Sequence, residues 1–440
     1  MRLGISMKKN IKNILIISSA NPESGPGVLA RDAKNALEND NLNVDVLTLF
    51  EVENHSEYKY ILKNNKFCLF TYKLYQRLLS IIPKQFGPYF LFYKNENCPP
   101  VPSSLVIKSI KREYDLVLIK FWQGMLSYKT VFAIHKKIKC PIFFECVDYG
   151  PFAGGCHFPG NCQRYKIGCG KCPAICSSNE NDFTHFNFLF RKKVIKEINP
   201  LIIANTYMFK WFNQSEIMNG LQHTVSFPII LEDIFKPMDR NLLRIKYCIP
   251  ENKQFILFFG SQSITDERKG MSFLIEAFDF VSAKLTKDEC SKFYLLVAGN
   301  ESKEILNKLN FEGKGLGFLQ TNDLAEIYAL SDSFLSPSIN DAGPMMVNQS
   351  ISCGTPVISF EMGTCIDSVK DKNTGFLAPL KDSEAFAECI IKMFRLSPEE
   401  KKNMRECCRL EALKTTSKKA YVDSVKKSYN DYNERIRKMI

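Results

Sequence analysis

The alternation of short apolar runs with amphipathic helical segments constrains this chain more than any other feature of its sequence. Apolar runs at residues 14–18, 44–49 and 116–119 in the first half, and at 255–259 and 293–298 in the second, have the length and side chains of buried strands. Segments with a helical period separate them. Strands that alternate with helices form parallel sheets covered on both faces. The sequence therefore predicts an α/β protein with doubly wound, Rossmann-like sheets.

The chain has 440 residues, which is more than the ~100–200 residues of one typical domain. A proline-containing segment at 227–237 interrupts the alternation and is predicted to be a linker. We expect a first domain over residues 1–228 and a second over 229–415, followed by a helix at 416–440 that packs back on the first domain. Doubly wound sheets bind ligands at the carboxyl ends of their strands, so the two domains are expected to face each other across a cleft.

The net charge of +12 is concentrated in the first half of the chain. Residues 1–240 hold 31 Lys and Arg against 20 Asp and Glu, whereas residues 241–440 hold 28 against 27. This asymmetry favours contact with an anionic membrane surface or a phosphate-bearing acceptor. The alternative is a generally solvated basic surface. A nucleic-acid partner would fit this charge, but it would leave the motif at 341–357 without a role, so none is expected.

Apolar stretches in the chain are short. None approaches the ~20 residues of a membrane span, and the run at 14–17 is shorter than the ~7–15 residues at the centre of a secretory signal. We therefore expect a cytoplasmic protein, with peripheral contact at the inner face of the membrane. Residues 67–93 are rich in Phe, Tyr, Leu and Lys; they suit either an amphipathic lipid-binding surface or internal packing, and we expect packing.

The second half contains a candidate diphosphate site after the predicted strand at 333–336. Pro344 suits the first position of a helix, and Gly354 suits its end. The unpaired N–H groups of that helix then lie at the carboxyl edge of the sheet, where a helix start binds phosphate. Asp341 is expected to accept a hydrogen bond from a sugar hydroxyl, and Gln349 to reach a ribose.

A pair of cations, Arg268 and Lys269, precedes Gly270 in the loop between a predicted strand and helix. Two positive charges at this edge suit a leaving diphosphate, which gains negative charge as the glycosidic bond breaks. A chance surface pair is the alternative interpretation. The position of the loop relative to Asp341 favours the site.

Together these residues form a pattern that resembles glycosyltransferase family 4. The pattern runs as Phe259-Gly260, Lys269-Gly270, Leu274-Ile275-Glu276-Ala277-Phe278, Asp341-x7-Gln349 and Gly354-Thr355-Pro356-Val357-Ile358. The resemblance implies the GT-B fold and a retaining mechanism without a required metal ion. Two departures stand out: the family usually has Glu at both ends of the x7 motif, and often Arg where this chain has Ser261.

The resemblance also implies roles for individual residues. Lys269, with Arg268, would bind the donor diphosphate, and Gly25 and Gly27 would form the facing glycine loop of the first domain. Backbone contacts to the donor would come from one run, namely Gly343, Pro344, Met345, Met346 and Val347, with Ser261 and Gln349 nearby. In the first domain the family has His-Asp where this chain has Val147 and Asp148, which leaves Asp148 as the candidate polar group.

The reaction implied is transfer of a sugar from a UDP- or GDP-sugar to a glycan or lipid-linked oligosaccharide. Cell-surface polysaccharide biosynthesis, of capsule or lipopolysaccharide, is the setting expected by analogy. Two alternatives remain open: a nucleotide-sugar epimerase on the same fold, and a non-catalytic, zinc-stabilised binding protein.

Five of the 16 cysteines crowd into a glycine-rich segment at 150–177. Four of them are the candidate ligands Cys156, Cys162, Cys169 and Cys172, and the segment resembles a Gly-Gly-Cys insertion found in some family members. Four thiolates fit a closed, structural zinc site, in which His157 or Cys176 is an alternative ligand. A set of reduced thiols in a loop is the other interpretation.

Overall fold

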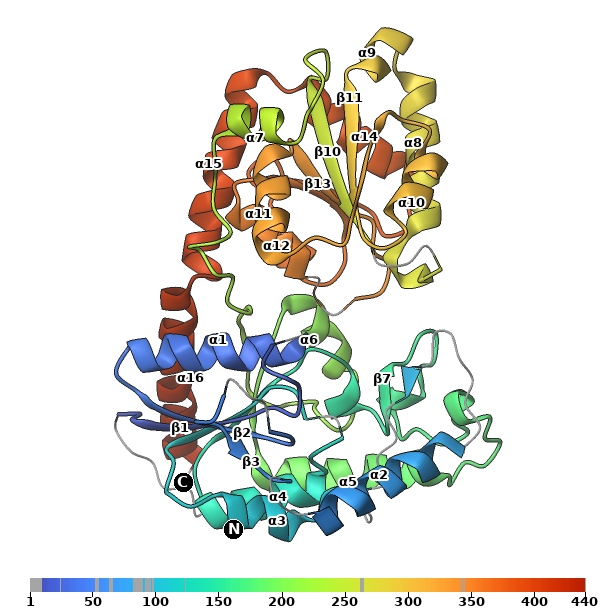
Figure 1. Cartoon of the computed structure of the whole chain (residues 1–440). Coiled ribbons are helices and arrows are strands. Elements are labelled where there is room, and N and C mark those ends of the chain that lie inside the picture. Colours follow the sequence, from blue (N-terminus) through green and yellow to red (C-terminus); the bar gives the residue numbers. More distant parts are fainter. Residues whose placement is uncertain are drawn as a thin grey trace. The chain divides into compact units, whose positions relative to one another are not determined.

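The computed structural model describes residues 10–439 except 24, 52–54, 63–65, 82–89, 92–95, 97–98, 123, 262–264, 342 and 344. The chain divides into two compact units (Figure 1). Unit 1 contains the described residues up to Ala204, then Met208–Ser226 and the chain from Tyr421 onward. Unit 2 contains Asn205–Tyr207 and Phe227–Ala420.

Unit 1 is built on a seven-stranded sheet with the order β3-β2-β1-β5-β6-β8-β9, in which every pair is parallel. The strands are β1 (Asn13–Ile17), β2 (Asn43–Thr48), β3 (Lys59–Tyr60), β5 (Leu116–Ile119), β6 (Ile142–Glu145), β8 (Leu201–Ala204) and β9 (His223–Val225). Successive strands run outward from β1 in one direction and from β5 in the other. The point between β1 and β5 is therefore a topological switch point, where α/β sheets bind ligands.

Helices cover both faces of this sheet, with α1 on one side and α3, α4 and α5 on the other (Figure 1). The helices are α1 (Pro26–Asn39), α2 (Lys66–Ile81), α3 (Ser103–Ser109), α4 (Tyr128–Ile138), α5 (Phe183–Ile198), α6 (Thr206–Phe212) and α16 (Lys418–Met439). Three short 3-10 helices, η1 (Gly150–Phe152), η2 (Arg164–Lys166) and η3 (Pro173–Ile175), and the antiparallel pair β4 (Phe90–Leu91) and β7 (Cys156–Phe158) complete the unit. The Tyr432 hydroxyl on α16 donates to the Asn199 carbonyl at 2.9 Å, so this last helix is fastened to the end of α5.

Unit 2 contains a six-stranded sheet with the order β12-β11-β10-β13-β14-β15, again parallel throughout. Its strands are β10 (Phe255–Gly260), β11 (Phe293–Ala298), β12 (Gly313–Gly317), β13 (Ser333–Ser336), β14 (Val357–Phe360) and β15 (Gly375–Ala378). The switch point lies between β10 and β13. Along β10 the side chains alternate between two apolar clusters, with Phe255, Leu257 and Phe259 in one and Ile256 and Phe258 in the other. Both faces of this strand are therefore buried, as its uninterrupted apolar run predicts.

The helices of unit 2 pack on these two clusters. They are α7 (Arg240–Lys246), η4 (Glu267–Lys269), α8 (Met271–Lys284), α9 (Lys287–Ser291), α10 (Ser302–Leu309), α11 (Thr321–Leu330), α12 (Met345–Ser352), α13 (Cys365–Ser368), α14 (Ser383–Arg395) and α15 (Pro398–Thr415). After α12, Gly354 adopts a φ of 71° and the Thr355 amide donates to the Ser350 carbonyl at 3.0 Å. A left-handed glycine that closes the helix is what the sequence predicted there.

One packing expectation from the sequence is wrong in part. The segment at 67–93 forms α2 over its first part, but Phe67, Phe70, Leu74 and Leu78 are 46–75 % exposed instead of packed inside. Residues 82–89 and 92–93 lie outside the described part of the chain. Within that part, no helix combines the length and apolarity needed to cross a bilayer.

A buried ion pair fixes the loop that follows β6. Arg191 and Glu96 are each 2 % exposed, and the Arg191 Nε donates to Glu96 Oε1 at 2.9 Å. The same guanidinium donates to the carbonyls of Gly150 and Ala153, while Glu96 Oε2 accepts from the Tyr128 amide at 2.6 Å. Each charge thus has several partners, as a buried pair requires.

We expect Arg191→Leu to destabilise unit 1 strongly, by about 3–5 kcal/mol, because it leaves the Glu96 carboxylate buried without its partner. Lys192→Gln is the matched control, since it removes the neighbouring exposed pair with Glu216, which is worth about 0–1 kcal/mol. Urea unfolding of both variants measures the difference. Equal midpoints would contradict a structural role for the buried pair.

Candidate donor and acceptor sites

A cavity of about 600 Å³ lies within unit 2, at the carboxyl ends of β10, β11 and β13. Its wall is partly apolar and partly polar, and includes Ser261, Asp266, Lys269, Phe318, Leu319, Leu324, Ser338 and Met346. An apolar pocket with a few convergent polar groups at a switch point is the usual form of a ligand site in this class of fold.

A glycine allows the loop that carries the two cations to lie close to the end of β13. Gly270 has a φ of 70°, and a Cβ at this position would lie 1.9 Å from the Pro337 carbonyl oxygen. The Ile339 amide donates to the Arg268 carbonyl at 2.8 Å, which joins the two loops. Only glycine satisfies both the backbone angle and the close approach.

The two loops meet in an ion pair between Lys269 and Asp341. Lys269 Nζ lies 2.7 Å from Asp341 Oδ2, and the Gly343 amide donates to Asp341 Oδ1 at 3.1 Å. The side chains are 33 % and 18 % exposed, respectively, and Lys269 lines the cavity while Asp341 is its ion-pair partner. Two residues that the sequence singled out separately, 72 positions apart, are thus adjacent.

Arg268 is held differently from Lys269. Its Nε and Nη2 donate to the two carboxylate oxygens of Asp266 at 3.0 and 2.8 Å, and Asp266 also caps η4. Among the described residues, Lys269 and Asp266 line the cavity, whereas Arg268 does not. The structure therefore brings one of the two predicted cations into the cavity wall.

Helix α12 begins beside the same cavity. Met346, in its first turn, lines the cavity, and a Cβ at Gly260 would lie 2.5 Å from its terminal methyl group. Met345 is half-buried, and Val347 is fully buried in the core. Pro344, predicted as the first helical residue, lies outside the described residues.

Gln349, predicted to reach a ribose, is half-buried one turn further along α12. Its Oε1 accepts from the Tyr328 hydroxyl at 3.5 Å. Complete burial raises the pKa of Tyr328 well above its ordinary value, which keeps this hydroxyl protonated and able to donate.

In unit 1, the predicted glycine loop joins β1 to α1. Gly25 has a φ of 50° at the N-cap of α1, and a Cβ at Gly27 would lie 1.8 Å from the Asn21 carbonyl oxygen. The turn therefore depends on both glycines, one for its backbone angle and one for the close approach. It lies at the carboxyl end of β1, beside the switch point of this sheet.

Asp148 lies just beyond β6 and is buried. Its Oδ1 accepts from the Gly150 amide at 2.6 Å, and its Oδ2 lies 2.8 Å from Nδ1 of His157 on β7. The His157 side chain is 20 % exposed. The imidazole of His157 therefore lies next to Asp148, although position 147 holds Val. The sequence did not predict this contact, because it suggested His157 only as an alternative metal ligand.

A second polar cluster at the carboxyl edge of unit 1 was missed from the sequence. Lys120, directly after β5, forms an ion pair with Glu145 at the end of β6, and the Tyr421 hydroxyl donates to Glu145 Oε1 at 2.6 Å. The ring of Tyr421 also lies 4.9 Å from Lys120 Nζ. Burial raises the pKa of Tyr421 well above its ordinary value. A charged residue directly after a buried strand is the signal that marks Lys120.

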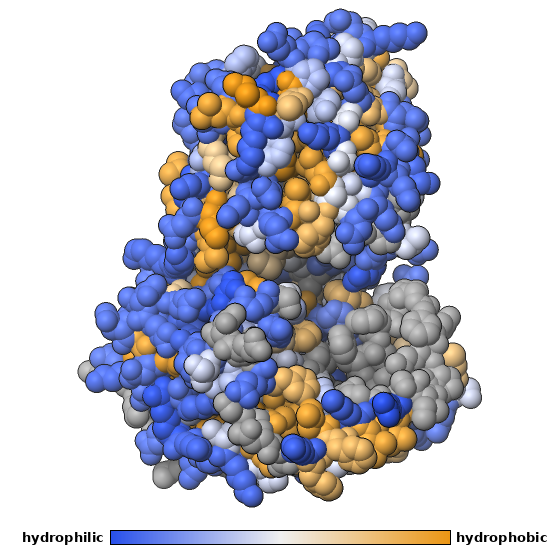
Figure 2. Space-filling view, in the orientation of Figure 1, coloured by the Kyte–Doolittle hydropathy of each residue, from blue (hydrophilic) through white to orange (hydrophobic). Residues whose placement is uncertain are grey.

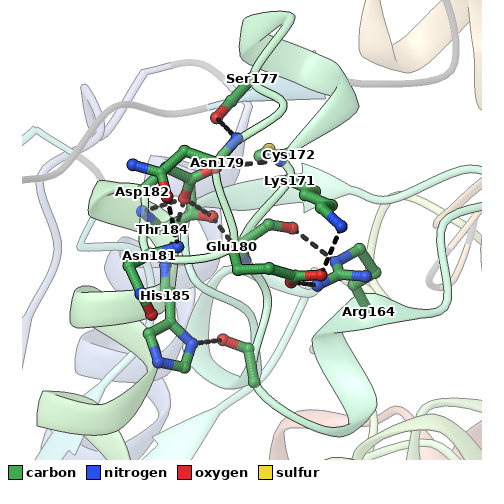
Figure 3. Close-up of polar contacts among 12 residues, drawn as sticks. Arg164, Lys171, Cys172, Ser177, Asn179, Glu180, Asn181, Asp182, Thr184 and His185 are labelled. Atoms are coloured by element: carbon green, nitrogen blue, oxygen red, sulfur yellow. Dashed lines mark hydrogen bonds and ion pairs between the residues drawn. The ribbon is translucent and has the colours of Figure 1, made fainter.

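The cysteine-rich segment is a hydrogen-bonded loop that docks on the start of α5 (Figure 3). The Asp182 carboxylate caps α5 through the Thr184 and His185 amides and also accepts from the Cys172 amide at 2.9 Å. Glu180 pairs with Lys171 and with Arg164. These contacts join the segment to the start of α5.

Cys156 and Cys172 form a hydrogen-bonded pair within this segment. The Cys156 thiol donates to Cys172 and lowers the pKa of Cys172 to about 7, while the same contact, with burial, raises the pKa of Cys156. Burial raises the pKa of Cys169 to about 12 and also raises that of Cys162. Over the described ranges, no three His, Cys, Asp or Glu side chains are grouped in a way that could hold a metal ion. The zinc site stays a prediction of the sequence.

Residues 253–395 match the family model described as glycosyl transferases group 1. The matched residues lie within unit 2 and make up less than half of the chain. The chain is similar to N-acetyl-alpha-D-glucosaminyl L-malate synthase of Bacillus anthracis, with 24 % identity over 186 residues that cover 42 % of this chain and 47 % of that protein. It is also similar to D-inositol 3-phosphate glycosyltransferase of Mycobacteroides abscessus, with 25 % identity over 170 residues and 36 % coverage of each protein. The matched part thus spans about half or less of these relatives.

Solved structures extend the similarity in fold to both units. Sucrose-phosphate synthase of Thermosynechococcus elongatus superposes with a TM-score of 0.66 at 16 % identity, covering 96 % of this chain and 99 % of that one. Anabaena HepE in complex with UDP and glucose superposes with a TM-score of 0.59 at 14 % identity, covering 96 % and 100 %. At such identities the likeness shows the fold alone. The two Rossmann-like units match those of GT-B glycosyltransferase structures, which confirms the predicted fold class.

Proposed function

We propose that this protein is a retaining glycosyltransferase whose donor is a UDP- or GDP-linked sugar. The observation that carries the proposal is that Lys269 and Met346, in the first turn of α12, line one cavity in unit 2. A cation and the unpaired amides at a helix start are complementary to a diphosphate. Crystal structures of Anabaena HepE contain UDP and glucose or UDP-glucose, which supports this donor class.

The ion pair between Lys269 and Asp341 gives the donor two partners. A bound diphosphate competes with the Asp341 carboxylate for Lys269 Nζ, and the released carboxylate can accept from a sugar hydroxyl. As the bond to the sugar breaks, the leaving diphosphate gains negative charge. Lys269 and the amides of α12 then stabilise it more strongly than they stabilise the bound substrate, which is what accelerates transfer.

The acceptor is assigned to the carboxyl edge of the sheet in unit 1. Gly25 and Gly27 shape the loop at the switch point there, and Asp148 holds the ring of His157. We assign to this Asp148–His157 pair the contact with the transferred sugar that the family resemblance implies for a His at position 147. Carboxylate contact through Nδ1 fixes the ring, which is how a histidine is oriented toward a substrate.

An anionic acceptor fits the charge of the chain, because residues 1–240 carry the excess of Lys and Arg. The relatives named above include enzymes named for malate and for inositol 3-phosphate, both of which are anions. A glycan carried on a lipid phosphate has the same chemistry, and assembly of a cell-surface polysaccharide on such a carrier is the setting we propose.

Lys269→Gln is expected to lower the turnover of the donor at least about tenfold, because it removes a charge contact to the leaving group. Lys284→Gln is the matched control: that lysine lies at the end of α8 in the same unit, in exposed pairs with Glu384 and Glu388. Hydrolysis of UDP- and GDP-sugars by both variants measures the effect. Unchanged kinetics of Lys269→Gln would remove this residue from the site.

His157→Asn should lower sugar turnover by roughly tenfold or more, as expected for loss of a positioned imidazole, while leaving UDP or GDP affinity unchanged. His185→Asn is the control, because that ring contacts the Gly168 carbonyl at 2.8 Å in the same segment but is not paired with Asp148. Calorimetric nucleotide binding and steady-state turnover separate the two effects. Equal turnover in both variants would argue against the Asp148–His157 assignment.

A further inference from the structure

Helix α2 has one side that packs on unit 1 and an opposite side that does not. On the packed side, the Tyr72 ring makes an edge contact with Phe50 at 5.4 Å, and a Cβ at Gly124 would lie 3.2 Å from the Tyr72 hydroxyl. Tyr75, nearly one turn on, is half-buried. Tyr72 and Tyr75 therefore define the face by which the helix is attached.

The opposite side carries four large apolar side chains. Phe67 is 75 % exposed, Phe70 64 %, Leu74 46 % and Leu78 56 %. Their spacing of three and four residues places them in one stripe along the helix, which extends for roughly 16 Å at 1.5 Å per residue. We call Phe67, Phe70, Leu74 and Leu78 the α2 stripe. Figure 2 shows an apolar surface where α2 lies in Figure 1.

The charges beside the stripe are all of one sign. Lys66, Lys73 and Arg77 repeat at intervals of seven and four residues, which puts them together along one border of the α2 stripe. The sequence of α2 contains no Asp or Glu. The helix thus has three zones around its axis: an attached face, an exposed apolar stripe and a basic border.

We propose that the α2 stripe inserts into the surface of an anionic lipid bilayer. An apolar stripe with a cationic border is the pattern of helices that lie in the membrane interface, where acyl chains receive the apolar side chains and lipid phosphates meet the cations. Long Lys and Arg side chains can reach the headgroups while their stems stay on apolar surface. Lysine is depleted at protein–protein interfaces, so the border favours lipid over a protein partner.

This inference goes beyond the proposed transfer reaction and does not depend on it, because bilayer binding requires neither donor nor acceptor. If the transfer reaction is also as proposed, the same contact brings unit 1 to the surface at which a lipid-linked acceptor would be found.

Flotation with vesicles tests the proposal. The full-length protein should float with vesicles of phosphatidylcholine and phosphatidylglycerol, and less with phosphatidylcholine alone. Phe70→Ser/Leu74→Ser should lower the bound fraction roughly tenfold or more, because two inserted side chains are lost. The control is Leu242→Ser/Ile245→Ser on α7 of unit 2. The native side chains at these positions are 65 % and 75 % exposed, and this variant should bind vesicles like the parent protein. Lys66→Gln/Lys73→Gln should weaken binding to the anionic vesicles and reduce its dependence on salt.

Two further measurements make the result decisive. Stabilisation by UDP or GDP in a thermal melt, equal in all variants and the parent, shows that the donor domain is intact. A Phe70→Trp variant should show fluorescence quenching by brominated lipids.

Absence of flotation by the parent protein, or equal loss in the α7 control, would overturn the proposal. Concentration-dependent self-association that is lost in Phe70→Ser/Leu74→Ser, without lipid binding, would assign the stripe to a second copy of the chain instead.

Discussion

The donor cavity depends on a close approach between two loops of unit 2. Gly270 lies so near the Pro337 carbonyl that no side chain fits between them, and this approach places Lys269 next to Asp341. Because β10 and β13 are neighbours in the sheet, the loops that follow them leave from the same edge. The fold therefore brings together a cation and a carboxylate that are far apart in the sequence, beside the start of a third element, α12.

Unit 1 uses the same principle with different residues. Its glycine turn, its Asp148–His157 pair and its cluster of Lys120, Glu145 and Tyr421 all lie at the carboxyl edge of a parallel sheet. The buried Arg191–Glu96 pair fixes the backbone just beyond Asp148. A rigid loop is what a positioned carboxylate requires, since a displacement of about 1 Å is enough to weaken catalysis severely.

Much of the fold could be predicted from the sequence, because strands buried on both faces are uninterrupted apolar runs. β10 and β11 begin and end within a residue of their predicted bounds. β12 was not predicted, since Gly313–Gly317 is rich in glycine and has no apolar pattern. The exposed side of α2 shows a second limit. Periodicity identifies an apolar face of a helix, but whether that face meets protein or solvent depends on neighbours distant in the sequence.

The candidate site was predictable to the extent that it depends on local backbone. The glycines at 25, 27 and 270 and the helix start near Met345 follow from turn and capping preferences. Side-chain pairing was not predictable. Arg268 pairs with Asp266, and His157 pairs with Asp148. Tyr421 donates a hydrogen bond to Glu145, which is 276 positions away in the sequence. Each of these contacts depends on which side chains the sheets bring together.

A crystal structure of the protein soaked with UDP or GDP tests the central claim most directly. We expect the diphosphate at about 2.7–3.2 Å from amide nitrogens in the first turn of α12, with Lys269 Nζ turned from Asp341 toward a phosphate oxygen. A nucleotide bound elsewhere, or a diphosphate in the cavity with Lys269 still paired to Asp341 and distant from every phosphate, would contradict it.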